Sequence, residues 1–141
     1  MKILMDFNQT YLDLSLYTLS HKSKDFIHQH IVDAFTAQTA DKQTKPIALV
    51  YALAGLYLHL VQNYTGRQVQ LAHIEMSKKT KVFNEITLPE NRGQITVAEV
   101  LRTPVGFQRD EMIHNWCMSV WDAYSNEHNK VVEMTKSLLQ K

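Results

Sequence analysis

The segment FIHQHIVDAF, residues 26–35, combines residue types that bind metals and move protons. His28 and His30 stand two residues apart, and Asp33 follows three residues after the second histidine. Imidazole nitrogens and carboxylate oxygens are common zinc ligands, and histidine exchanges protons near neutral pH. On a strand, side chains two apart share a face, so both imidazoles could hold one ion, whereas on a helix they diverge. The chemistry of this segment depends on the element that carries it.

The apolar residues of the segment indicate a helix. They recur at the helical period, as Ile27, Ile31, Ala34 and Phe35. Ser23 is a residue type that caps helix N-termini. On this helix His28 lies at the edge of the apolar face and is expected to serve the interior. His30 falls on the opposite flank, where Asp33, one turn on, is expected to favour the charged imidazolium and so raise its pKa.

A metal centre is the most specific chemical hypothesis for this chain. Helical bundles that bind catalytic metals take ligands from several helices facing one interior. Four of the seven histidines fall on four separate expected helices: His30, His59, His73 and His114. Against this, the chain has no HxxxH or HExxH pair. A divalent metal cofactor is therefore the alternative hypothesis, and whether the chain is an enzyme stays open.

Composition indicates a soluble globular domain. The chain has 141 residues, of which 45% are hydrophobic and 21% charged, and a formal charge of +1. A balance so close to neutral argues against nucleic acid or an anionic membrane surface as partner. Cys117 is the only cysteine, which excludes an intrachain disulfide, and its apolar neighbours predict a buried, unreactive thiol. We expect a reducing, cytoplasmic setting.

The remaining elements are also expected to be helical. Residues 11–19 fit either a strand or a helix, and helix is preferred because the chain shows no partner strand. Pro46 suits the first turn of the next helix, which runs from about 46 to 64 and ends at Gly66. This helix is apolar nearly all round but too short to span a bilayer, which needs about 20 residues. Gly55 would let a neighbouring helix approach closely.

Further helices follow Gly66. The stretch RQVQLAHIEMSKK predicts one whose inward residues are Val69, Ala72 (or His73) and Met76. Thr96 and Glu99 have capping-box spacing and would start a short helix that stops before Pro104. The rest is one long helix or two joined near residues 125–126. Its apolar stripes are Ile113, Cys117, Val120 and Tyr124, then Val131, Met134 and Leu138.

Together these patterns predict a single all-α domain over residues 1–141. Five or six helices would pack around the central apolar helix at about 46–64. Neither a repeat nor a domain boundary interrupts the chain.

Several strings resemble an uncharacterised bacterial family of small all-helical domains of unknown function. They are YTLSH (17–21), FIHQHIVDAF (26–35), TGRQVQLAH (65–73), RGQITVAEVL (92–101) and WCMSVW (116–121). The resemblance covers most of the chain after Tyr17 but implies no activity. The residues that carry the family pattern are Tyr17, His21, His28, His30, Asp33, Gln38, Arg67, Gln68, Gln70, His73, Trp116 and Trp121.

From these positions we expect a polar pocket between helices. Its candidate residues are His28, Asp33, Gln38, Tyr51, Arg67, Gln70, Trp116 and Trp121. Some of these residues, and His59 of the central helix, also have a structural interpretation. His59 suits a core histidine bonded to backbone, Gln38 needs buried partners that Tyr17 or Tyr51 could supply, and both tryptophans could be core anchors.

Function is predicted only at the level of class. The leading hypothesis is a domain that binds a small molecule or a partner through the polar pocket. The alternative is a metal-dependent enzyme of helical-bundle type with histidine and aspartate ligands. A third hypothesis, a homodimer-forming structural protein, rests on the apolar stripes of the C-terminal segment.

Overall fold

The computed structural model describes residues 2–20, 25–79 and 85–139, with side chains from Asn8 onward. Within these ranges it contains seven α-helices, a short 3₁₀ helix and no strand. The α-helices are α1 (Lys2–Ser20), α2 (His28–Thr39), α3 (Pro46–Leu60), α4 (Gly66–Ser77), α5 (Val97–Arg102), α6 (Phe107–Ala123) and α7 (His128–Leu139); the 3₁₀ helix is η1 (Ser125–Glu127). The all-α prediction is confirmed. Ser23, the expected cap of α2, lies outside the described residues.

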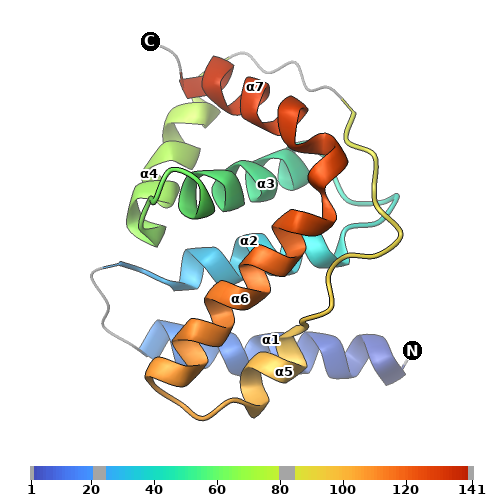
Figure 1. The fold of residues 1–141 in the computed structure, drawn as a ribbon, viewed down its shortest axis with the longest axis vertical. Coiled ribbons are helices and arrows are strands. Elements are labelled where there is room, and N and C mark those ends of the chain that lie inside the picture. The colour runs from blue at the N-terminus through green and yellow to red at the C-terminus, as the bar shows by residue number, and fades with distance from the viewer. Residues whose placement is uncertain (1, 21–24, 80–84, 140–141) are drawn as a thin grey trace.

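The apolar helix α3 occupies the centre of the molecule. It contacts α2, α4, α6 and α7, while α1 packs on α2 and α5 at the end opposite α7 (Figure 1). Its residues from Leu49 to Leu58 are buried apart from the half-buried Tyr51, as expected of a helix apolar on every side. No helix among the described residues has the length and apolar character needed to cross a membrane.

The end of α3 differs from the prediction. The helix stops at Leu60, and Gly66 begins α4 rather than ending α3. Between them Asn63 adopts a positive φ of 61°, which turns the chain and which asparagine tolerates better than most residues. Glycine at position 66 lets the start of α4 approach the backbone of Phe26 closely, because a Cβ there would collide with the Phe26 carbonyl oxygen.

The capping box is at a different helix from the one predicted. Thr96 makes no side-chain cap bond, so the expected Thr96–Glu99 box is absent. The Glu99 N–H donates instead to the Thr96 backbone carbonyl at 3.1 Å, which satisfies the donor that the hydroxyl would have bound. The complete box is at α4, where Thr65 and Gln68 exchange side-chain and backbone bonds of 2.8 and 3.1 Å.

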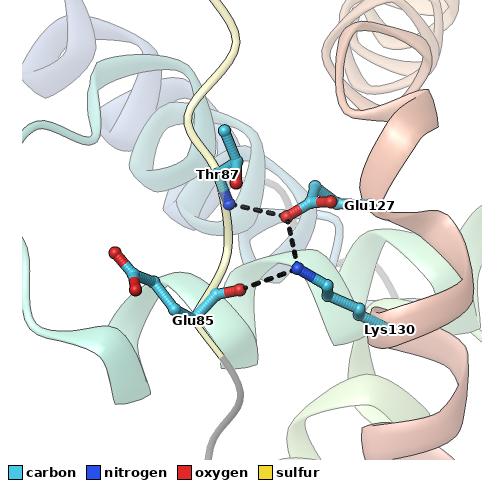
Figure 2. Close-up of polar contacts among 4 residues, drawn as sticks. All are labelled: Glu85, Thr87, Glu127 and Lys130. Carbon is cyan, nitrogen blue, oxygen red and sulfur yellow. Dashed lines mark hydrogen bonds and ion pairs between the residues drawn. The ribbon is translucent and has the colours of Figure 1, made fainter.

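The C-terminal segment forms two helices that bend at Tyr124 and η1, one of the two alternatives predicted. A polar network holds the bend against residues 85–88: Glu127 accepts the Thr87 N–H at 2.6 Å and Lys130 at 3.3 Å, while Lys130 also reaches the Glu85 carbonyl (Figure 2). The predicted apolar stripes are buried within the chain. They therefore no longer support a homodimer, which stays a prediction.

The first helix is confirmed, but its leucines are not all inward. Leu14 is buried, as is Thr18 one turn later. Leu12, Leu16 and Leu19, the residues that share a helical face, are 55%, 69% and 57% exposed. The helix packs on α2 and α5 through its other side, so the shared face of the leucines did not indicate which side of the helix is covered.

Candidate functional site

Three histidines from three helices meet beside a cavity. His30 of α2 stacks on His59 of α3, with ring centroids 3.5 Å apart and planes at 15°. His114 of α6 meets His59 edge-on, with centroids 5.5 Å apart and planes at 87°. All three line a pocket of about 290 Å³. We call this the histidine pocket; its other lining residues are Asp25, Ile27, Leu60, Asn63, Tyr64, Thr65, Asp110 and Ile113.

His30 is the most buried of the three histidines in the pocket. The residue is 4% exposed, and its Nδ1 has no hydrogen-bond partner among the described residues. Burial first, and then charge repulsion from the neighbouring His59 and His114, lower the pKa of the His30 imidazole to about 3. The ring is therefore neutral at neutral pH.

This burial contradicts the predicted pairing of His30 with Asp33. The two histidines do diverge as a helix requires, since His28 Nδ1 bonds the Thr18 hydroxyl at 2.9 Å on α1 while His30 faces α3. Both flanks of α2 are covered by neighbouring helices, however, so the flank assigned to solvent is interior. Desolvation then lowers the His30 pKa where an exposed carboxylate pair would have raised it.

His59 is held by the backbone at the end of α3. Its Nδ1 lies 3.0 Å from the Tyr64 carbonyl oxygen, which can only accept, so Nδ1 carries the proton and Nε2 keeps a lone pair. This confirms the expected core histidine bonded to backbone. Burial lowers the His59 pKa; the Tyr64 bond raises it by less, and His114 adds a further lowering effect.

Two carboxylates line the same pocket. Asp25 precedes α2, and Asp110 lies one turn before His114 on α6. The Tyr17 hydroxyl donates to Asp110 Oδ1 at 2.7 Å, which fixes that side chain from α1. Asp110 was not among the predicted site residues. The string DEMIH carried the signal, because both acidic residues stand one turn before His114.

The backbone is strained at two positions next to the histidine pocket. Phe26 and Asn63 are the non-glycine residues with positive φ in the described chain, at 51° and 61°. Phe26 lies between the lining residues Asp25 and Ile27, and Asn63 is itself a lining residue. The backbone N–H of Arg67 donates to the Asp25 carbonyl oxygen at 3.1 Å and so holds residues 25–27 against the start of α4. Such conformations persist where surrounding structure enforces them, and they cluster at functional sites.

Asp33 lies in the interior, one turn beyond His30. Its Oδ1 accepts from Gln29 at 3.1 Å, but its Oδ2 has no partner among the described residues. A Cβ on Gly55 would collide with Oδ2 and lie 2.7 Å from Cγ, so Gly55 makes room for this carboxyl group on α3. Burial raises the pKa of Asp33 well above its usual range, with a smaller opposing effect from the Gln29 bond.

Gln38, near the C-terminal end of α2, and Trp116 and Trp121 of α6 are buried in the core. The Trp116 indole donates to Gln38 Oε1 at 2.9 Å, and Gln38 Nε2 donates to the Ile95 carbonyl at 2.7 Å. The prediction that Tyr17 or Tyr51 would be the hydrogen-bond partner of Gln38 is therefore wrong. Trp121 stacks on His128 at 3.7 Å. The glutamine and tryptophans make internal contacts of the kind expected for structural residues.

The remaining predicted residues lie around α4. Arg67 is exposed and donates to Gln70 at 2.8 Å, one turn along the helix. His73 stacks on Tyr51 at 5.3 Å and bonds the Tyr51 carbonyl at 2.8 Å, away from the other histidines. The structure thus brings His30, His59 and His114 together, and it places His28, Asp33, Gln38 and Arg67 in separate contacts.

Metal coordination is not set up in the described residues. No group of three or more histidine, cysteine, aspartate or glutamate side chains there could hold an ion. The stacking of His30 on His59 gives a reason, because imidazole lone pairs lie in the ring plane and those of parallel rings do not converge. Cys117 is buried as predicted, and burial raises the pKa of its thiol.

Residues 8–125 match the model of a family of unknown function, DUF5946. Because the match covers most of the chain, the protein belongs to that family, which confirms the resemblance to a family of small helical domains. Comparison with curated proteins gave no match, and comparison with solved structures gave none.

Proposed function

We propose that the protein is a small-molecule-binding domain whose ligand enters the histidine pocket. The observation that carries the proposal is the meeting of His30, His59 and His114, from three different helices, beside a cavity of about 290 Å³. Ligand sites in helical proteins lie between helices and combine a few polar groups with apolar walls. The pocket has this composition, since Ile27, Leu60 and Ile113 line it together with the imidazoles.

Energetics also favour a functional role for the pocket. A buried polar atom without a partner costs about 1–3 kcal/mol, and the His30 Nδ1 is such an atom. A residue in an unfavourable backbone region costs about 1–3 kcal/mol, and Phe26 and Asn63 flank the cavity. An apolar residue of similar shape in place of His30 would remove the cost of the unpartnered Nδ1. Features that lower stability and gather at one cavity are typical of a binding site.

A ligand screen with paired histidine variants tests the proposal. A library of small fragments would be added to the labelled full chain while backbone amide and imidazole signals are followed by NMR. We expect hits that shift signals around His30, His59 and His114, and we expect His59→Gln to abolish them. His128→Gln is the matched control, because His128 also stacks on a ring and bonds a backbone carbonyl, but near Trp121. Hits that survive His59→Gln, or a library without hits, would contradict the proposal.

A metal-dependent enzyme of helical-bundle type is the second candidate. It is favoured because three of the four histidines proposed as ligands lie beside one cavity. Ion binding would require the exposed His114 to turn, since the described side chains do not already surround one point. Elemental analysis of protein purified without chelators tests it. A first-row metal at one ion per chain, lost in His59→Gln, would place this candidate first.

We also propose a cytoplasmic setting in a bacterium. The support is indirect: a single buried cysteine suits a reducing compartment, and the family resemblance is bacterial. The near-neutral charge supports a small-molecule ligand rather than nucleic acid. A homodimer remains a separate proposal, which light scattering on the purified chain would test.

A further inference from the structure

We infer that the ligand of the histidine pocket is a small organic cation, an amine that is protonated at neutral pH. The inference rests on the proposed function and adds the chemical class of the ligand. It is carried by the charges that line the cavity, by the hydrogen-bonding state of His59 and by the size of the space.

Among the lining residues that the structure describes, the formal charges have one sign. Asp25 and Asp110 are the ionisable acids around the histidine pocket, and no lysine or arginine is among its described lining residues. Arg109, next to Asp110 in sequence, lies outside the pocket lining: its guanidinium donates to the backbone carbonyls of Leu101 and Thr103, at 2.8 and 3.0 Å, and lies over the Tyr17 ring, 4.7 Å from its centroid. The carboxylate of Asp110 binds the neutral Tyr17 hydroxyl instead. An anionic ligand would be repelled here, whereas a cation would be attracted.

The His59 imidazole is set up to accept a hydrogen bond. The Nδ1–H group of His59 donates a hydrogen bond to the Tyr64 carbonyl oxygen, so the Nε2 of the neutral ring is an acceptor. Stacking of His30 on His59 would bring two positive charges to 3.5 Å if both rings were protonated, which disfavours the charged forms. A protonated amine supplies N–H donors that match acceptors of this kind. A carboxylate ligand would supply acceptors only.

The size of the pocket favours an organic ion over a bare metal ion. A space of about 290 Å³ is close to the lower end of small-molecule sites, which run from about 300 Å³ upward. A first-row metal ion lies about 2 Å from each of its ligand atoms and so needs far less space. The described side chains also do not offer three metal ligands around one point. The apolar residues Ile27, Leu60 and Ile113 would contact the hydrocarbon part of an amine.

A matched series of probes tests the charge preference on the unaltered protein. Butylammonium, butanol and butyrate have the same hydrocarbon chain with a positive, neutral or negative head. Dissociation constants would be measured by NMR titration of the full chain at neutral pH. We expect butylammonium to bind roughly tenfold or more tightly than the other two, as expected for a charge-assisted bond, with shifts centred on His59 and His114. Equal binding of the three probes, or tighter binding of butyrate, would overturn the inference.

Variants then locate the charge. Asp110→Asn should weaken butylammonium binding by roughly tenfold, since it removes one carboxylate and keeps the shape. Asp122→Asn is the control, because Asp122 is an exposed aspartate of the same helix outside the pocket, and binding should not change. Circular dichroism of both variants would verify folding. If Asp110→Asn folds and binds like the parent, the inference fails.

Two further outcomes separate this inference from the proposed function. If butylammonium does not bind but a neutral or anionic fragment shifts the pocket signals, the cation inference fails and the proposed function stands. If Zn²⁺ binds at one ion per chain, displaces butylammonium and loses affinity in His59→Gln, the occupant is a metal ion and the organic cation is rejected. A pocket that binds no probe or fragment would overturn both.

Discussion

The two halves of α2 differ in the hydrogen bonding of their buried polar groups. Near the C-terminal end, Gln38 accepts from Trp116 at 2.9 Å and donates to the Ile95 carbonyl at 2.7 Å. Arg92 extends this network to the Ala40 carbonyl at 2.6 Å. In the N-terminal half, the Nδ1 of His30 and the Oδ2 of Asp33 are buried without a partner among the described residues.

The contrast separates structural polar groups from candidate functional ones. A fully bonded cluster is a way to join distant segments, and the Gln38 cluster ties α2 to α6 and to residues 92–95. A partly bonded cluster lowers stability and needs another explanation. His30, which carries one of the two unsatisfied atoms, lines the histidine pocket, and this is why we assign the ligand there and not to the glutamine and tryptophans.

The largest effect is expected from Gly55→Leu, which removes the space that Asp33 occupies. Any Cβ at Gly55 collides with the Asp33 carboxyl group and lies 3.2 Å from a methyl group of Val69. Overpacking costs typically about 1–3 kcal/mol and sometimes more, and here it also displaces a buried acid, so we expect at least about 3 kcal/mol. Denaturant unfolding measures it. Ala48→Leu, at an exposed position of α3, should change stability by less than about 0.5 kcal/mol.

Gln38→Leu should break the satisfied cluster. It leaves the Trp116 indole N–H and the Ile95 carbonyl without their partner inside the core. Each such group costs about 1–3 kcal/mol, so we expect a loss of about 2–4 kcal/mol in the free energy of unfolding. Gln43→Leu, at an exposed site, is the control. Similar unfolding curves for the two variants would show that the network contributes little to stability.

The unsatisfied cluster should show itself in the pH dependence of stability. The pKa of His30 falls from its ordinary 6.5 to about 3 on folding, so in acid the unfolded chain binds a proton that the folded chain does not. Stability should therefore decline as pH falls below about 6.5. Asp33 has the opposite sign: its raised pKa makes the folded form lose stability as pH rises above the ordinary 3.8.

Variants assign the two limbs of that profile. His30→Phe should flatten the acid decline between about pH 6.5 and 4, because it removes one group that must stay neutral in the fold. Asp33→Asn should instead flatten the decline toward higher pH. Unfolding free energies measured across this range would show both. An acid limb unchanged in His30→Phe would mean that His30 is not desolvated in the folded protein.

The sequence predicted the helices because apolar periodicity is a local signal. Ile31 and Ala34 are buried as the period requires, and so are Val69 and Met76 of α4. Periodicity also limited the prediction. It gave the angle between His28 and His30 but not which flank other helices cover, and the covering of His30 reversed the direction of its pKa shift.

The pocket itself depended on information that the chain does not display locally. Phe26 gave no sign of a positive φ, which follows from the clamp between Asp25 and Arg67. Asp110 was recognisable from its spacing to His114 but not from any link to His30, which is eighty residues earlier. Three of the four histidines proposed as ligands did lie together: His30 and His59 are on helix faces that neighbouring helices cover, whereas His114 is exposed at the same pocket.

Apart from the controls, the smallest stability change is expected from His30→Phe, and it gives the most direct test of our account. The substitution keeps a ring against His59 and removes the unpartnered Nδ1, so at neutral pH the free energy of unfolding should stay within about 1 kcal/mol of the parent or rise. Binding of butylammonium, measured on the same sample, should be lost. Unimpaired binding, or a loss of stability as large as that of Gln38→Leu, would show that His30 is a structural residue and contradict the account.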